Sequence, residues 1–187
     1  MKRIYLVTGN QKKLKEWQAI VPEDIELDSA NIDLPELQSD DPEVIVADKA
    51  KRAYETVGEP VVVEDVSAGL DKFDGLPGPF IKYFVQRLGG DALYKIAGEE
   101  ETAATVSCSV AYFDGTTLLT VRGDVHGKVV APRGDNMFSF DVVFVPDGET
   151  ETFSEMDPDK KNSLSHRSKA IKLFIEKFEA MQVNAAG

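Results

Sequence analysis

Hydrophobic and polar positions change their period several times along the first part of the chain. Residues 3–7 form a short apolar run that predicts a strand, and the turn Thr8-Gly9-Asn10 follows. Apolar side chains at Leu14, Trp17, Ile20 and Val21 then recur at helical spacing. The chain therefore begins with a predicted strand, turn and helix unit.

A second strand is predicted over residues 25–27, and a helix over residues 43–57 ends at Gly58. The apolar run that follows Pro60 predicts a buried strand, which delivers Glu64 and Asp65 at its end. Carboxylates at strand ends are common metal ligands in α/β proteins. An exposed pair of loop carboxylates is an equally good interpretation of these two residues alone.

Helical spacing predicts a helix over residues 80–88 and a short one over residues 91–97. Residues 105–113 alternate between apolar and small polar side chains, which predicts a half-buried strand. The hairpin signal Asp114-Gly115 follows this strand.

A return strand over residues 118–122 is expected after the hairpin, and a third strand over residues 123–130 after a bulge. Residues 138–145 are aromatic and favour a strand, and the final helix is predicted from about residue 165 to residue 181.

The chain carries a formal net charge of -12, yet the segment KKNSLSHRSKAIK at 160–172 gathers cations. Cations and hydroxyls at a helix N-terminus favour a phosphate-bearing ligand, because free N–H groups and the helix dipole add to the side-chain charge. A solvated helix start capped by Ser165 is the plainer alternative.

Three lysines, Lys12, Lys13 and Lys15, fall near the start of the first predicted helix, where cations oppose the helix dipole. Their placement is easier to explain if an anion binds there. The stretch is not a P-loop, since the glycine spacing and the GK[ST] ending are missing. A plain strand-to-helix connection is the alternative for this turn.

Composition limits the classes of protein. With 187 residues and 42% hydrophobic side chains, the chain can bury one sizeable core. A single cysteine, Cys108, excludes a disulfide within the chain and favours a reducing compartment. No apolar run approaches membrane-spanning length, and the N-terminus lacks the features of a signal peptide, so we expect a cytoplasmic protein without membrane partners. An acidic composition also argues against nucleic-acid binding.

Seven stretches together resemble one family, the inosine triphosphate pyrophosphatases, and especially the branch that includes the eukaryotic enzyme. The stretches run in the family's order and cover nearly the whole chain. They are VTGNQKKLKE (7–16), IDLPE (32–36), VVEDV (62–66), GLPGPFIKYF (75–84), GKVVAPRG (127–134), FSFDVVFVPDG (138–148) and KKNSLSHRSKA (160–170).

The resemblance implies an α/β fold with an elongated, twisted mixed β-sheet, flanking helices and two lobes around a central nucleotide cleft. It implies one domain of this type over residues 1–187, and a homodimer. The activity it implies is hydrolysis of deaminated purine nucleoside triphosphates (ITP, dITP, XTP) to the monophosphate and pyrophosphate.

The resemblance also implies roles for individual residues. Asp65 and Lys13 would be catalytic, and Glu36 and Asp65 would hold Mg²⁺. The remaining substrate-binding positions fall on the matching motifs: Thr8, Gly9, Asn10, Lys12, Lys49, Lys82, Phe138, Asp141, Lys161, Ser165, His166 and Arg167. Phe138 would stack on the base, and the polar edge of the base would face Asp141, Ser165, His166 and Arg167.

These residue types suit the chemistry, since lysines neutralise phosphates and carboxylates bind a hard cation. The chain departs from the family at Ser139 and Val142, where glycine and proline are usual. Two alternatives stay open, a non-catalytic nucleotide-binding or sensing protein of the same fold and a pyrophosphatase for other modified nucleotides. The presence of Glu36, Glu64 and Asp65 favours an enzyme.

Overall fold

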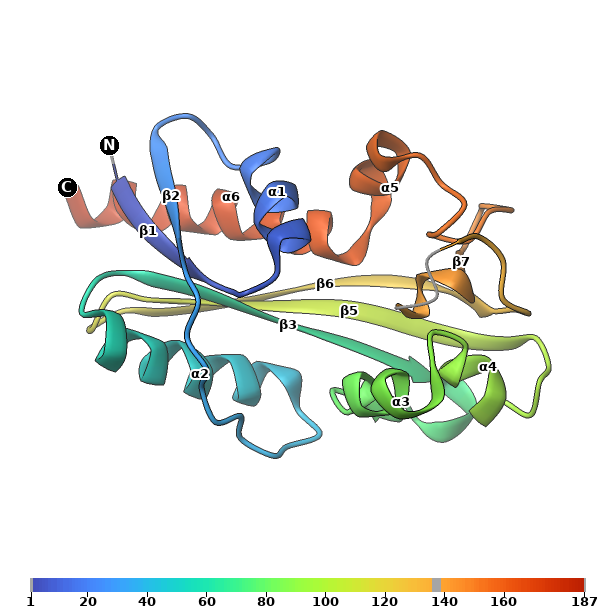
Figure 1. Cartoon of the computed structure of the whole chain (residues 1–187). Coiled ribbons are helices and arrows are strands. Elements are labelled where there is room, and N and C mark those ends of the chain that lie inside the picture. Colours follow the sequence, from blue (N-terminus) through green and yellow to red (C-terminus); the bar gives the residue numbers. More distant parts are fainter. Residues whose placement is uncertain (1, 136–138, 187) are drawn as a thin grey trace. The chain divides into compact units, whose positions relative to one another are not determined.

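The computed structural model describes residues 2–135 and 139–186, and within them a seven-stranded mixed sheet (Figure 1). Neighbouring strands are hydrogen-bonded in the order β2-β1-β3-β5-β6-β7, and β4 pairs with β3. The strands are β1 (Lys2–Val7), β2 (Ile25–Ala30), β3 (Val61–Leu70), β4 (Pro77–Gly78), β5 (Thr102–Phe113), β6 (Leu118–Val129) and β7 (Phe144–Pro146). β1 runs parallel to β2 and β3, whereas β4 and β7 are antiparallel to their partners.

Helices of very different lengths connect these strands. The α-helices are α1 (Gln11–Gln18), α2 (Pro42–Val57), α3 (Ile81–Leu88), α4 (Ala92–Ile96), α5 (Pro158–Leu164) and α6 (His166–Ala186). Two 3₁₀ turns, η1 (Asp71–Phe73) and η2 (Phe140–Val142), complete the regular structure of the described residues. Local signals fix several ends: Asp41 caps α2, Pro42 occupies its first turn, and Gly58 ends it in the left-handed conformation.

The chain divides into two compact units, and β3, β5 and β6 each run from one unit into the other. Unit 1 comprises residues 1–65, 108–123 and 167–187, and unit 2 comprises residues 66–107 and 124–166. Neither unit is a continuous stretch of chain. The single domain over residues 1–187 and the nucleotide cleft stay predictions.

Unit 1 covers both faces of its strands. α1 and α6 lie on one face and α2 on the other (Figure 1). On the α6 face the rings of Trp17, Tyr112, Phe174 and Phe178 contact one another, with centroids 5.0–6.2 Å apart. On the other face buried small side chains of α2 pack on Val61, Val63 and their neighbours.

Unit 2 has its own hydrophobic core. Its buried members come from β3, α3, α4, β5, β6 and the segment from Phe140 to Met156. Phe144 and Phe153 pack at its centre with ring centroids 5.3 Å apart, and both are almost fully buried. Each unit therefore buries enough apolar surface to hold its own functional side chains in place.

Most predicted elements are confirmed, and four predictions need correction. The first helix ends at Gln18, so Ile20 and Val21 lie beyond it. β3 continues five residues past Asp65 to Leu70. β6 is one continuous strand over Leu118–Val129, so the predicted bulge and third strand are wrong. The basic segment contains a separate helix, α5, before α6 begins at His166.

Two further strand predictions differ from the structure. β5 was expected to be half-buried, yet Ser107 and Ser109 on its polar face are buried as well. Burial of both faces depends on packing by other parts of the chain, which the local pattern does not report. In residues 139–145, the turn η2 precedes a strand of three residues, so most of the expected strand is absent from this described part.

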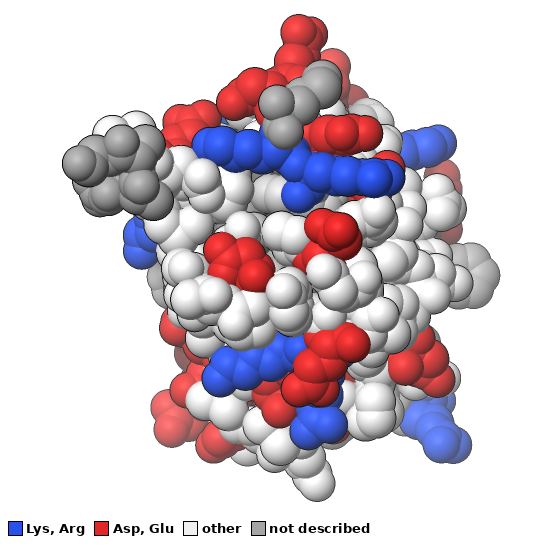
Figure 2. Space-filling view, turned by 90° about the vertical axis from the view of Figure 1, so that its left-hand side faces the viewer, with Lys and Arg blue, Asp and Glu red and all other residues white. Residues whose placement is uncertain are grey.

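Charged side chains of both signs are interspersed on the face seen in Figure 2, where Lys and Arg lie beside Asp and Glu. Ion pairs of the described residues include Arg52 with Asp48 on α2 and Lys95 with Asp91 beside α4. Among the described residues no helix is both long and apolar enough to cross a membrane.

Tyr112 gives the unit 1 core a testable pH dependence. Burial and the neighbouring Asp114 raise the pKa of Tyr112 to about 12 from 10.0. The folded chain thus binds the phenol proton more tightly than the unfolded chain, so its contribution to stability is complete below pH 10 and is lost between pH 10 and about 12. We expect urea unfolding midpoints to fall more steeply over this range in the wild type than in Tyr112→Phe. Parallel curves for the two proteins would contradict the assignment.

Candidate active site

The turn between β1 and α1 is organised by its own side chains. Thr8 Oγ1 accepts from the backbone N–H of Asn10 at 3.0 Å, and Asn10 Oδ1 accepts from those of Lys12 and Lys13 at 2.9 and 3.4 Å. Asn10 is therefore the N-cap of α1. A side chain at Gly9 would place its Cβ 2.6 Å from Asn31 Oδ1, so the backbone can pass there only as glycine unless Asn31 moves.

This turn lies beside the middle of β3. Leu6 of β1 pairs with Val62 of β3 in parallel register, so the residues that follow Val7 are next to Glu64 and Asp65. Ligands of open α/β sheets bind outside the carboxyl ends of the strands. The register thus brings the cationic start of α1 and the two carboxylates of β3 to one place in unit 1.

The side chain of Glu64 is 1% exposed and is contacted by donors of three other residues. Oε1 lies 2.9 Å from Lys13 Nζ, and Oε2 accepts from the indole Nε1 of Trp17 at 2.8 Å. Arg167 Nε lies 3.0 and 3.1 Å from the two oxygens. Arg167 Nη1 also donates to Glu16 at 2.5 Å. Two cations and one neutral donor therefore surround this anion.

These contacts decide the charge state of Glu64. Burial alone would raise the pKa of Glu64, but Arg167, Lys13 and the Trp17 hydrogen bond outweigh it and hold the pKa well below its usual range. The same carboxylate helps to keep Arg167 charged despite burial, so its pKa is raised. Glu64 and Arg167 are thus a permanently charged pair.

Asp65 follows Glu64 on the same strand, so its side chain points to the opposite face, toward α2. Lys49 of α2 lies on this side, with Nζ 3.2 Å from Glu36 Oε1. Burial lowers the pKa of Lys49, and the charge of Asp65 partly offsets this effect. The structure therefore brings Glu36, Lys49 and Asp65 into one electrostatic neighbourhood.

The donor set of Glu36 and Asp65 fits a magnesium ion. Mg²⁺ prefers oxygen ligands and is usually bound through one or two carboxylates while it keeps several waters. Among the described residues no group of three or more His, Cys, Asp or Glu side chains converges, so a site for a fully protein-coordinated metal is absent there. A site with two carboxylates suits Mg²⁺ bound together with phosphates.

The predicted residues of unit 2 form a second group. The backbone N–H of Asp141 donates to the hydroxyl of Ser139, two residues earlier, at 3.4 Å. Asp141 Oδ2 accepts from Lys161 Nζ of α5 at 2.7 Å, and this ammonium also lies 5.7 Å from the ring centroid of Phe153. The carboxylate and the lysine are thus paired, with both side chains mostly buried.

His166 and Ser165 lie at the junction of α5 and α6 and are buried. The His166 ring lies 6.0 Å from Phe140 and 5.8 Å from Phe153, measured between centroids. Lys82 lies on α3, with Nζ 5.0 Å from the Tyr83 ring centroid. Phe138 is outside the described residues, so its stacking role stays a prediction.

The predicted roles of the site residues stay predictions, and Arg167 has the strongest competing contacts. Its Nε and Nη1 already bond to carboxylates of Glu64 and Glu16. Sequence reasoning did not find the parts played by Glu16, Glu64 and Trp17. One signal was available for Glu64, because strand alternation places it and Asp65 on opposite faces.

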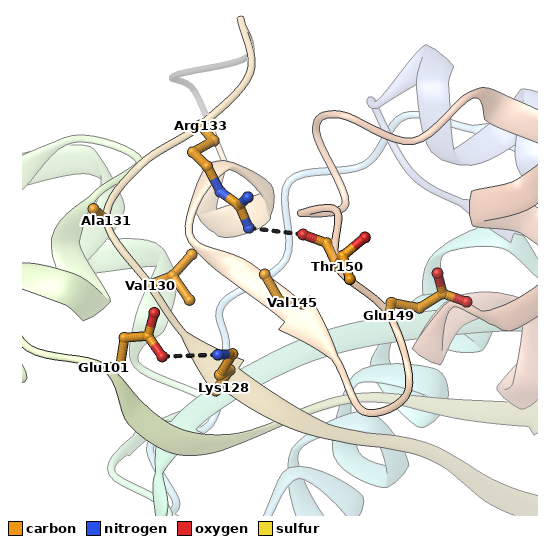
Figure 3. A pocket seen from close by; sticks show the side chains of 8 residues that line it. All are labelled: Glu101, Lys128, Val130, Ala131, Arg133, Val145, Glu149 and Thr150. Atoms are coloured by element: carbon orange, nitrogen blue, oxygen red, sulfur yellow. Dashed lines mark hydrogen bonds and ion pairs between the residues drawn. The ribbon is translucent and has the colours of Figure 1, made fainter.

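The pocket of Figure 3 is lined by residues of unit 2 and has a volume of about 380 Å³. Its cations are already engaged: Lys128 pairs with Glu101 at 2.7 Å, and Arg133 donates to the carbonyl of Thr150 at 3.0 Å. None of the predicted site residues that the structure describes lines this pocket. We therefore do not place the active site there.

Arg167 provides a stability test of the Glu64 cluster. Arg167→Ala leaves a buried carboxylate with one cation fewer, and removal of one partner from a buried ion pair costs about 3–5 kcal/mol. We expect a loss of this size in urea unfolding of the variant. Arg3→Ala, which breaks the exposed pair with Asp28, is the matched control and should change stability little. Equal effects of the two substitutions would contradict a buried cluster.

Comparison with known proteins places this geometry in a family. The chain is 44% identical over 172 residues to an inosine triphosphate pyrophosphatase of Yarrowia lipolytica, covering 90% of this chain and 91% of the relative. It is 40% identical over 173 residues to the protein of the same name from Pyricularia oryzae, covering 91% and 90%.

Solved structures share the fold. A HAM1 protein from Coxiella burnetii and the Ham1 protein of Staphylococcus aureus each superpose with a TM-score of 0.82, at 23% and 22% sequence identity. Each match covers 96% of this chain and all of the other. The predicted mixed α/β fold is thereby confirmed. The model of the Ham1 family matches residues 4–177. The seven collinear motifs, the fold and these relatives agree, and the chain belongs to the Ham1 family.

Proposed function

We propose that this protein hydrolyses the deaminated purine nucleoside triphosphates ITP, dITP and XTP to the monophosphate and pyrophosphate, and so clears them from the nucleotide pool. The observation that carries the proposal is the meeting of the cationic start of α1 with the carboxylates of β3 in unit 1. The relatives named inosine triphosphate pyrophosphatase supply the substrate class, since they match along nine-tenths of the chain.

The residues of unit 1 suit the triphosphate. Lys13 and Lys12 lie at the N-terminal end of α1, where backbone N–H groups and the helix dipole also attract anions. The turn of Thr8, Gly9 and Asn10 sets the direction of this helix start. Lys13 is proposed as the catalytic cation that stabilises negative charge as the bond between the α- and β-phosphates breaks.

Glu36 and Asp65 are proposed to hold Mg²⁺, which would neutralise phosphate charge and favour departure of pyrophosphate. Asp65 is also proposed to orient the attacking water and accept its proton. Lys49 is proposed to contact the phosphates from the α2 side, and its ion pair with Glu36, one of the two proposed metal ligands, supports this placement. Mutual positioning of these groups accounts for most of the expected catalysis.

Recognition of the base is assigned to Phe138, Asp141, Ser165, His166 and Arg167. Donors that face O6 would favour inosine and xanthosine over adenosine, because a buried donor that faces an amino group loses its partner. Lys161 holds Asp141 and is proposed to reach a phosphate, as is Lys82. The homodimer and the cytoplasmic location remain proposals, of which the first is measurable by light scattering on the purified protein.

The first functional prediction concerns products. Incubation with Mg²⁺ and a panel of triphosphates should release pyrophosphate rapidly from ITP, dITP and XTP, and far more slowly from ATP and GTP. Pyrophosphate and orthophosphate are measured separately by coupled assays. Orthophosphate as the main product, or equal rates on all purines, would overturn the proposal. Binding of ITP without turnover would instead support a nucleotide sensor, and a preference for other modified bases a different pyrophosphatase.

The second functional prediction concerns the metal. Asp65→Asn should lower kcat by about 10²-fold or more, because both water orientation and metal binding suffer. Glu36→Gln should lose activity that high Mg²⁺ partly restores. Asp48→Asn, a carboxylate of α2 that pairs with Arg52, is the matched control and should leave turnover unchanged. Near-normal turnover of the Asp65 variant would remove this residue from the mechanism.

A further inference from the structure

The contacts of Glu64 divide between its two oxygens. Oε1 faces Lys13 Nζ at 2.9 Å, Oε2 accepts from Trp17 Nε1 at 2.8 Å, and Arg167 Nε bridges both at 3.0 and 3.1 Å. The carboxylate plane is therefore fixed on one side by the indole and the guanidinium. Because these contacts restrict rotation of the carboxylate, Oε1 stays directed toward Lys13.

The four side chains differ in their access to solvent. Glu64 is 1% exposed, Arg167 is 13% exposed and Trp17 is fully buried against Phe174, with ring centroids 5.8 Å apart. Lys13 is 25% exposed, so its ammonium lies between the buried carboxylate and the solvent. An anion from solution can thus approach the exposed side of the Lys13 ammonium while Glu64 holds this ammonium from the buried side.

Stability alone does not explain such a cluster. A buried ion pair is often no more stabilising than apolar side chains of the same volume, because both ions lose their hydration. The cluster does, however, fix the position of one partly exposed cation, the ammonium of Lys13. A lysine on a long flexible stem otherwise loses much rotamer freedom when it binds a ligand.

We propose that Glu64 is a positioning residue that, held in place by Trp17 and Arg167, sets Lys13 Nζ where the triphosphate binds. This inference rests on the proposed function, since it deepens the role of Lys13. Glu64 itself does not touch the substrate. Trp17 contributes to this positioning, because its indole N–H holds Oε2 and so fixes the orientation of the carboxylate.

Kinetics of Glu64→Gln test the proposal. The amide keeps the size of the side chain but loses the charge that holds Lys13, and misplacement of a positioning group by about 1 Å can cost about 10²-fold. We expect kcat/KM for ITP to fall between about tenfold and about 10²-fold, with circular dichroism unchanged. Asp28→Asn, the equivalent carboxylate-to-amide change in the exposed pair with Arg3, is the control and should match the wild type. Wild-type kinetics of a folded Glu64→Gln would overturn the inference.

A double-mutant cycle separates positioning from a general structural effect. If Glu64 acts through Lys13, then Lys13→Met and Glu64→Gln share one pathway, and their effects on kcat/KM do not multiply. The double variant should be about as impaired as Lys13→Met alone. Multiplicative losses would mean that Glu64 acts independently of Lys13, which would overturn the inference.

Trp17 supplies a signal that does not need turnover, because it is the single tryptophan of the chain. Inorganic pyrophosphate bound at Lys13 changes the field at Glu64, to which the indole is hydrogen-bonded. Titration with pyrophosphate should therefore shift or quench tryptophan emission in the wild type, and this change should be absent in Lys13→Met and weakened in Glu64→Gln. An equal response in all three proteins would overturn the inference.

These readouts keep the two proposals apart. A wild type that binds pyrophosphate with the expected fluorescence change, yet releases none from ITP, would contradict the proposed function. It would still support the positioning of Lys13 by Glu64. If Glu64→Gln does not fold, Trp17→Phe replaces it, because this substitution removes the N–H donor while it keeps an aromatic ring, although a smaller one, at the position. Its kcat/KM should then fall about three- to tenfold, in line with one neutral hydrogen bond, and no fall would overturn the role of Trp17.

Discussion

A carboxylate that is removed from water must be surrounded by donors, and unit 1 is arranged around this requirement at Glu64. The partners come from two helices, with Lys13 and Trp17 on α1 and Arg167 on α6. Because the desolvation of an unpaired charge is costly, both helices are restricted to positions that keep their donors in contact with β3. The charge thus fixes the geometry of the elements that carry the phosphate-binding candidates.

Strand alternation then separates two kinds of chemistry at neighbouring positions. Glu64 faces α1 and α6, where it is neutralised, and Asp65 faces the side of α2, where Lys49 and Glu36 lie. One carboxylate is thereby committed to protein cations and the next stays in a setting that suits a metal. A shift of register by one residue would exchange the two roles, so the pairing of β1 with β3 matters for the site as much as for the fold.

Sequence patterns predicted the elements well where the cause was local. The stop at Gly58 and the strand–turn–helix start both depend on neighbouring residues. Burial of Ser107 and Ser109 depends on packing by segments elsewhere in the chain, which no local period reports. The Trp17–Glu64 bond joins residues 47 positions apart, so the resemblance could point to Lys13 and Asp65 without revealing what holds Lys13.

The non-contiguous make-up of unit 1 has a consequence for how the protein is made. Arg167 and Glu64 are separated by 103 residues, so β3 is synthesised well before α6. Before α6 is synthesised, Arg167 cannot pair with Glu64, which can contact its partners on α1. The apolar face around Trp17 and Tyr112 is not yet covered by Phe174 and Phe178. Contacts of such long range slow folding and leave apolar surface open during synthesis. The Glu64 cluster is therefore completed only after α6 has been synthesised, and until then the apolar surface that α6 covers is exposed to aggregation.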